Sequence, residues 1–128
     1  MNTDEHRLLT EKALGAIFEV ANTLGAGFLE KVYQRALTRE LLIRGMQATP
    51  EASFPVLYKG QGVGEYFADI LVEGQLVIEL KCTDHLTNEH MAQCINYLRA
   101  SGMPLCLLVN FQKPTVEWKR VLNKFLTE

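Results

Sequence analysis

The fold of this chain is decided by residues 68–81, which read ADILVEGQLVIELK. Two apolar runs flank a short polar segment at its centre, and this pattern predicts two strands joined by a tight turn. Both faces of these strands carry apolar side chains, as expected of strands that are covered on both sides. Asp69, Glu79 and Lys81 therefore need a specific explanation, because isolated buried charges are unfavourable.

The length of the turn determines whether Asp69 and Glu79 meet. A two-residue turn would send the two carboxylates to opposite faces of the sheet. A three-residue turn over residues 73–75 places Asp69 opposite Glu79 and also matches apolar residues across the hairpin, such as Ile70 with Ile78. We prefer this register, which requires a left-handed backbone conformation within the turn.

Asp69, Glu79 and Lys81 together suit metal-dependent hydrolysis of a phosphodiester. Facing carboxylates repel each other unless a cation lies between them, and Mg²⁺ is commonly held by one or two carboxylates with water and phosphate oxygens. Lys81 shares a strand face with Glu79, where it can stabilise negative charge or orient an attacking water. Structural ion pairs are a commoner origin of such clusters, so the spacing alone leaves both interpretations open.

The remaining sequence predicts the order α-α-β-β-β-α-β-(β). The expected elements are helices over 4–24, 28–44 and 87–101, a peripheral strand over 52–58, the hairpin strands over 63–72 and 76–82, a strand over 104–110, and an edge strand over 116–122. The continuous apolar run of the strand over 104–110 suits burial on both faces. This order predicts an α/β fold in the α+β sense, with a mixed central sheet flanked by helices, in a single domain over residues 1–128.

Composition limits the classes of function. The chain has 128 residues, is 48% hydrophobic and carries a net charge of −2, which disfavours a protein that coats nucleic acid but not an enzyme that contacts a few phosphates. There is no apolar run long enough to span a membrane, and the polar N-terminus does not resemble a signal peptide. The three cysteines, Cys82, Cys94 and Cys106, form no C-x-x-C pair, which favours reduced thiols in a cytoplasmic protein.

Two motifs resemble a known family. Asp69 followed by Glu79-Leu80-Lys81 resembles the bipartite motif of the PD-(D/E)xK nuclease superfamily, with Ala68 in place of the usual proline. Gly27-Phe28-Leu29-Glu30-Lys31-Val32-Tyr33 reads G-x-x-E-x-x-Y, and residues 9–122 resemble the GxxExxY protein family within that superfamily. The resemblance implies a restriction-endonuclease-like core and a Mg²⁺-dependent nuclease, with Mn²⁺ as the alternative ion and DNA favoured over RNA as its nucleic-acid partner.

The resemblance also implies a catalytic role for Glu30. It would join Asp69 and Glu79 as a metal ligand, with the main-chain carbonyl of Leu80 as a further ligand. Gly27, three residues earlier, would share a helix face with Glu30 and permit close approach to the sheet. Taken without the resemblance, Glu30 would more often serve only as an acidic residue at a helix N-terminus.

Four further residues are secondary candidates near the substrate. Gln93 and Tyr97 form Q-x-x-x-Y on one helix face, and a similar motif follows the E-x-K lysine of RecB-type nucleases, which implies that this pair supports the active site or substrate. His90 lies three residues before Gln93, although a solvated histidine is the commoner interpretation. Tyr33 more often packs in the core with a satisfied hydroxyl.

Lys31, Arg35 and Arg39 recur at every fourth residue and form a basic stripe. Such a stripe could follow a phosphate backbone, but solvated helix charge is commoner. The alternative to a nuclease is a catalytically silent module of the same fold that acts in binding or protein interaction, as a homodimer or beside a partner protein.

Overall fold

The computed structural model describes residues 3–126, so the expected domain limits at residues 1–2 and 127–128 lie outside the described residues. The helices and strands follow the predicted order. They are α1 (Thr3–Leu24), α2 (Glu30–Ile43), β1 (Ala48–Tyr58), β2 (Gln61–Val72), β3 (Leu76–Lys81), α3 (Asn88–Ser101), β4 (Leu105–Asn110) and β5 (Glu117–Leu122).

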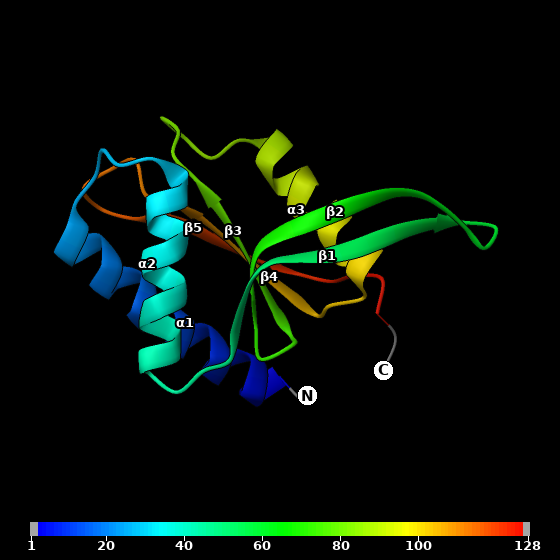
Figure 1. Cartoon of the computed structure of the whole chain (residues 1–128), viewed down its shortest axis with the longest axis horizontal. Coiled ribbons are helices and arrows are strands. Elements are labelled where there is room, and N and C mark those ends of the chain that lie inside the picture. Colours follow the sequence, from blue (N-terminus) through cyan, green and yellow to red (C-terminus); the bar gives the residue numbers. More distant parts are fainter. Residues whose placement is uncertain (1–2, 127–128) are drawn as a thin grey trace.

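The strands form one mixed sheet in the order β1-β2-β3-β4-β5. β1, β2 and β3 are antiparallel neighbours, α3 then crosses to β4, which runs parallel to β3, and β5 returns antiparallel to β4. The helices α1 and α2 lie on one side of this sheet and α3 on the other (Figure 1). The predicted mixed sheet flanked by helices is thus confirmed.

Each face of the sheet buries an apolar cluster. α1 and α2 pack over the side that includes Ile78 and Leu107, whereas α3 packs over Val77 and Leu108. Alternate residues of β3 and β4 contribute to the two clusters, and every residue of β4 is buried. β4 is therefore covered on both faces, as its continuous apolar run predicts.

The turn between β2 and β3 has the predicted three-residue form. Ile70 pairs with Ile78, as the apolar matching requires. Glu73 and Gly74 both adopt left-handed conformations, with φ of 54° and 64°. The hairpin therefore takes the register that places Asp69 and Glu79 across from each other.

β1 is longer than the expected peripheral strand, because it begins at Ala48 and continues through Pro50. It lies at the edge of the sheet, where the missing N–H of a proline need not interrupt a ladder. β1 and β2 extend together beyond the body of the molecule as a two-stranded arm (Figure 1). Leu57 and Val63 of this arm are exposed.

The helices end close to the expected residues. Gly45 follows α2 with φ of 84°, so the predicted glycine stop is confirmed. Gly102 closes α3 in the same way, with φ of 70°. Among residues 3–126, no helix is both long enough and apolar enough to cross a membrane.

Candidate active site

The strands β2 and β3 separate at Asp69. Their ladder ends with the pair Ile70 and Ile78, and side chains replace the main-chain partners one residue further on. The N–H of Asp69 donates to Oε1 of Glu79 at 3.2 Å, and the N–H of Leu80 donates to Oδ2 of Asp69 at 2.7 Å. The two carboxylates therefore converge where the strands part.

Gln34 of α2 holds the main chain of β2 at Asp69, where the two strands separate. Its side chain is buried, and Nε2 donates to the main-chain oxygen of Asp69 at 2.8 Å. In a regular strand Ala68 and Ile70 would face the same way, but they pack in the two opposite clusters. Glu51 of β1, which lies across from Asp69, has a left-handed φ of 55°. β2 thus changes face at Asp69, and side chains satisfy the main-chain groups that this change frees.

The carboxylates of Asp69 and Glu79 are desolvated. Glu79 is 3% exposed. Burial, followed by the nearby charge of Asp69, raises the pKa of Glu79 to about 9. Burial also raises the pKa of Asp69, although the Leu80 N–H and the charge of Lys81 oppose the shift. Burial and the charge of Asp69 therefore favour a protonated Glu79 unless a cation lies beside the pair.

Lys81 and the face of α3 complete the polar cluster. Nζ of Lys81 donates to Oε1 of Gln93 at 2.9 Å. Tyr97 lies one turn beyond Gln93 on α3, and its pKa is raised by burial and then by the charges of Glu79 and Asp69. The structure therefore brings the predicted Q-x-x-x-Y face of α3 to the two carboxylates and the lysine.

Glu30 is the first residue of α2 and belongs to the same electrostatic environment. Although Glu30 is exposed, desolvation by its neighbours raises its pKa, the charge of Asp69 adds to the shift, and Lys81 and His90 oppose it. Gly27 does not share a helix face with Glu30, because it lies in the preceding loop with φ of 112°. A Cβ there would meet open space, so the expected close approach to the sheet is wrong. The glycine instead permits the left-handed backbone of the loop.

Tyr33 fixes the loop before α2. Its hydroxyl donates to the main-chain oxygen of Gly25 and accepts the N–H of Phe28 at 3.2 Å. Its buried ring stacks on Phe111 with a centroid separation of 4.6 Å. These contacts account for the residue structurally, and a role for Tyr33 near the substrate stays a prediction.

His90 caps the N-terminus of α3 together with Thr87. The N–H of Thr87 donates to Nδ1 of His90 at 3.0 Å, and the N–H of His90 donates to Oγ1 of Thr87 at 3.3 Å. This reciprocal capping box positions the helix that carries Gln93 and Tyr97. A contact between His90 and the substrate stays a prediction.

The predicted metal ligands do not form a ready-made site. Within residues 3–126, no group of three or more His, Cys, Asp or Glu side chains is arranged to hold a metal ion. Asp69 and Glu79 each accept a main-chain N–H instead. Their oxygens are nevertheless the hard donors that Mg²⁺ prefers, so the chemistry of the pair fits such an ion.

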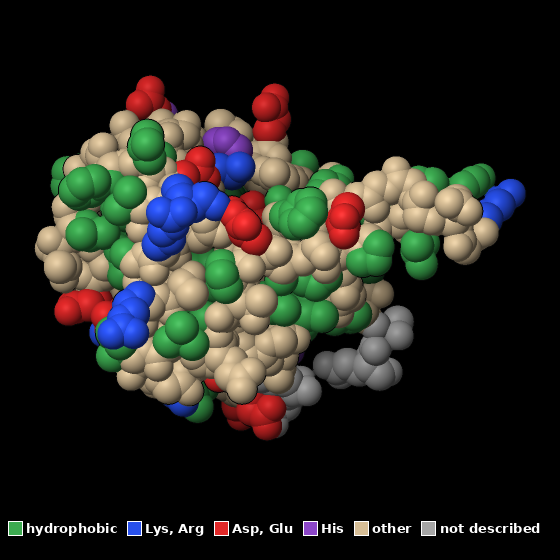
Figure 2. All heavy atoms as spheres, viewed as in Figure 1, with side chains coloured by type: hydrophobic (Ala, Val, Ile, Leu, Met, Phe, Trp, Pro, Cys, Tyr) green, Lys and Arg blue, Asp and Glu red, His purple; other side chains and the backbone are tan. Residues whose placement is uncertain are grey.

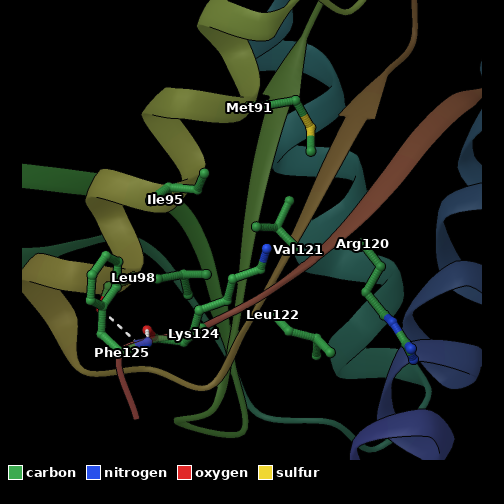
Figure 3. A pocket seen from close by; sticks show the side chains of 9 residues that line it. Met91, Ile95, Leu98, Arg120, Val121, Leu122, Lys124 and Phe125 are labelled. Carbon is green, nitrogen blue, oxygen red and sulfur yellow. Dashed lines mark hydrogen bonds between the residues drawn. The ribbon is translucent and has the colours of Figure 1, made fainter.

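The polar cluster around Asp69 and Glu79 is distinct from the cavity between α3 and β5. Basic, acidic and histidine side chains gather beside α2 and the base of the arm on the face shown in Figure 2. A cavity of about 470 Å³ lies elsewhere, between α3 and β5 (Figure 3). Its lining is largely apolar, with Ile95, Leu98 and Val121, and includes none of the predicted site residues.

Gln34 and Glu51 are missed by prediction from the sequence. Gln34 stands next to Tyr33 and one turn before Leu37, both fully buried, so a polar residue at a core position is the signal that could have identified it. Glu51 offers no comparable signal, because its left-handed conformation depends on the change of face in the neighbouring strand β2.

Comparison with solved structures supports the fold. The crystal structure of SSO0001 is 18% identical, covers 89% of this chain and 57% of that chain, and has a TM-score of 0.57. The structure of LHK-Exo in complex with dAMP is 14% identical, covers 85% of this chain and 76% of that chain, and has a TM-score of 0.51. LHK-Exo is an alkaline exonuclease from Laribacter hongkongensis, and another structure of it is 18% identical over 73% of this chain and 55% of that chain, with a TM-score of 0.45.

This chain spans little more than half the length of SSO0001. At these identities the likeness concerns the fold, which agrees with the expected restriction-endonuclease-like core. None of the curated protein sequences compared with this chain matches it. The family comparison is more specific, because the family model of the PD-(D/E)XK nuclease superfamily matches residues 7–121, a range that includes every candidate site residue. The chain therefore belongs to the PD-(D/E)XK nuclease superfamily.

Proposed function

We propose that this chain is a nuclease that hydrolyses phosphodiester bonds of nucleic acid with the help of Mg²⁺ or Mn²⁺. The observation that carries the proposal is the pair of desolvated carboxylates, Asp69 and Glu79, where β2 and β3 separate, with Lys81 nearby on β3. Superfamily membership supports the class of reaction. The proposal includes membership of the GxxExxY family, a single nuclease domain over residues 1–128, DNA as the substrate and a cytoplasmic location.

The acidic pair fits a divalent cation on chemical grounds. Burial raises the pKa values of both Asp69 and Glu79, the charge of Asp69 raises that of Glu79 further, and a cation beside the two carboxylates would remove this repulsion. Asp69 and Glu79 would hold the ion, with Glu30 and the main-chain carbonyl of Leu80 as further ligands. A bound ion supplies Lewis acidity and lowers the pKa of a coordinated water.

The side chains around the pair have complementary tasks. Hydrolysis joins a water oxygen to phosphorus, breaks the ester P–O bond and leaves a proton on the departing oxygen. The ammonium group of Lys81, held by Oε1 of Gln93, stabilises the negative charge that develops on the phosphate. Tyr97 keeps its proton at neutral pH, as tyrosine ordinarily does and as its raised pKa reinforces, so its hydroxyl can donate to a phosphate oxygen.

The test measures cleavage and metal binding on the same set of proteins. Cleavage of single-stranded and duplex DNA and RNA with Mg²⁺ or Mn²⁺ should fall by about 100-fold or more in Asp69→Asn, Glu79→Gln and Lys81→Met. The matched controls Glu65→Gln and Lys119→Met change exposed residues and should keep full activity. Calorimetry should show loss of metal binding in Asp69→Asn and Glu79→Gln but not in Lys81→Met. Full cleavage by Glu79→Gln would show that the site is wrongly assigned.

A catalytically silent binding module is the second candidate function. It is favoured by the engagement of both carboxylates with main-chain N–H groups, and by the lack of an assembled three-carboxylate set among residues 3–126. Nucleic-acid binding by the wild-type protein without cleavage of any substrate would support this function. Light scattering would then establish whether the chain acts as a homodimer, and copurification whether it acts with a partner protein.

A further inference from the structure

We propose that a groove between α2 and β1 binds the sugar–phosphate backbone of a single strand of nucleic acid and leads it to Asp69. This α2–β1 groove has a volume of about 370 Å³, and its lining includes Lys31, Gln34, Arg35, Arg39 and Glu51. The inference rests on the proposed function for the site that the strand reaches, but it concerns binding and not hydrolysis.

The groove carries a row of cations with unused charge. Lys31, Arg35 and Arg39 are spaced four residues apart on α2, so they lie along one face of the helix. Lys31 is paired with Glu51, whereas neither Arg35 nor Arg39 forms an ion pair within the described part of the chain. Exposed guanidinium groups in such a row suit successive phosphates, which they bind through paired N–H donors.

The groove ends at the candidate active site. Gln34 lines the groove and also donates to the main-chain oxygen of Asp69. Glu51 lines it as well and lies between the β1 residues that pair on either side of Asp69. The charges of Lys31 and Glu51 both influence the pKa of Asp69. A strand whose phosphates follow the cations of α2 is therefore led to the point where β2 and β3 separate.

The lining indicates contact with the backbone and not with the bases. Besides its charged residues and Gln34, the groove offers the hydroxyl of Thr38 and the small apolar surfaces of Leu42 and Pro50, but its lining includes no aromatic side chain. Sites that hold single strands by their bases stack them on aromatic rings. Recognition through phosphates alone predicts binding that is independent of sequence and strongly dependent on salt.

Glu51 limits the affinity of the groove. Its carboxylate neutralises Lys31 through their ion pair, and the charge of Arg35 also acts on it. An incoming phosphate must compete with this carboxylate for Lys31. Replacing Glu51 by the isosteric glutamine should therefore strengthen binding, which is an outcome that a merely structural ion pair would not produce.

The experiment measures the fluorescence anisotropy of a labelled oligothymidylate over a series of salt concentrations, with EDTA present so that no cleavage occurs. The double variant Arg35→Ala/Arg39→Ala should bind about tenfold more weakly or worse, and its slope of log affinity against log salt should be smaller by about 1.4, or about 0.7 for each lost contact. The charge-matched control Arg7→Ala/Lys12→Ala changes exposed residues of α1 and should bind within about twofold of wild type. Glu51→Gln should bind about threefold more tightly or better.

The outcomes separate this inference from the proposed nuclease activity. The proposed role of the groove would be wrong if both double variants weakened binding equally or if Glu51→Gln left binding unchanged. It would also be wrong if a duplex of the same length bound more tightly than the single strand. If the wild-type protein binds but does not cleave, and only the groove variant Arg35→Ala/Arg39→Ala loses binding, the proposed role of the groove is supported and the proposed nuclease activity is contradicted. If cleavage requires Glu79 but is unchanged in the groove variant, the nuclease activity is supported and the proposed role of the groove is contradicted.

Discussion

Asp69 and Glu79 are joined across the separation of β2 and β3 by complementary hydrogen bonds. Glu79 accepts the N–H of Asp69, and Asp69 accepts the N–H of Leu80, the residue after Glu79. Each carboxylate thus replaces a main-chain acceptor where the ladder ends. The groups that offer the candidate chemistry also hold the sheet together, so protonation, metal binding and stability are linked at this point.

The metal-free protein should lose stability as the pH rises. The pKa of Glu79 is about 9 in the folded protein, against an ordinary value of 4.5. Between these values the folded protein keeps a proton that the unfolded chain has released, so the free energy of unfolding falls with pH by up to about 1.4 kcal/mol per unit. The stabilisation is fully present below the lower value and is lost as the pH passes the higher one. Urea unfolding in EDTA at a series of pH values measures this slope.

Glu79→Gln provides the internal check on that slope, because glutamine cannot ionise. Its free energy of unfolding should fall with pH less steeply than that of the wild type, with the remaining slope due to groups such as Asp69, whose pKa is also raised. The exposed control Glu65→Gln should retain the wild-type slope. Wild-type stability that increases from acidic to alkaline pH would be incompatible with a buried Glu79 carboxyl that is neutral in the folded state.

Gly74→Ala should destabilise the hairpin that sets the register. Gly74 has φ of 64° in the turn, and a side chain in this conformation costs about 1–2 kcal/mol. Gly62→Ala is the matched control, because a Cβ there also meets open space but the backbone is not left-handed. Urea unfolding should show a loss of about 1 kcal/mol or more for Gly74→Ala and little change for Gly62→Ala. Equal effects would mean that the turn does not require the left-handed backbone.

Tyr33→Phe should affect stability and leave the chemistry intact. The change removes the hydroxyl that bonds to Gly25 and Phe28 but keeps the ring that stacks on Phe111. We expect a loss of about 1 kcal/mol in the free energy of unfolding and kcat/KM within about twofold of wild type, measured well below the melting temperature. A large fall in kcat/KM without a change in stability would instead support the predicted role of Tyr33 near the substrate.

The register of the hairpin and the order of the elements could be predicted because several apolar residues in each element indicate the same arrangement. The apolar residues nearest the turn pair with apolar partners in the preferred register, and Ile70 meets Ile78 only with an odd-length turn. The burial of β4 could likewise be predicted, because its six consecutive residues are all buried and alternate between the two faces of the sheet. The convergence of Asp69 and Glu79 follows from the register, so it could also be predicted from the sequence.

The change of face in β2 could not be predicted in this way. A period of two assumes a regular strand, and under that assumption Ala68 and Ile70 share a face. In the structure they do not, because the main chain of Asp69 is held by two residues distant in sequence, Gln34 and Glu79. The same limit applies to Gly27, whose position relative to Glu30 depends on where the loop ends and α2 begins.

Gln34→Leu should weaken the candidate metal site without touching a ligand. The substitution removes the donor to the main-chain oxygen of Asp69, and a buried carbonyl without a partner costs about 1–3 kcal/mol. Because this hydrogen bond holds β2 where it changes face, the Asp69 carboxylate should lose its alignment, and Mg²⁺ or Mn²⁺ affinity should fall by about 10-fold or more, as for other groups that orient metal ligands. Calorimetric titration measures the affinity, and amide hydrogen exchange at Asp69 and Leu80 reports the opening of the strands.

The matched control for Gln34→Leu is Thr38→Val, one turn later on α2. Its hydroxyl donates to the main-chain oxygen of Gln34, so the variant loses a hydrogen bond within the helix but keeps the contact with Asp69. Thr38→Val should therefore retain wild-type metal affinity and slow exchange at both amides. If Gln34→Leu also retained them, the hydrogen bond from Gln34 would not be needed to hold Asp69. The carboxylate of Glu79 would then be sufficient to keep the separated strands in place.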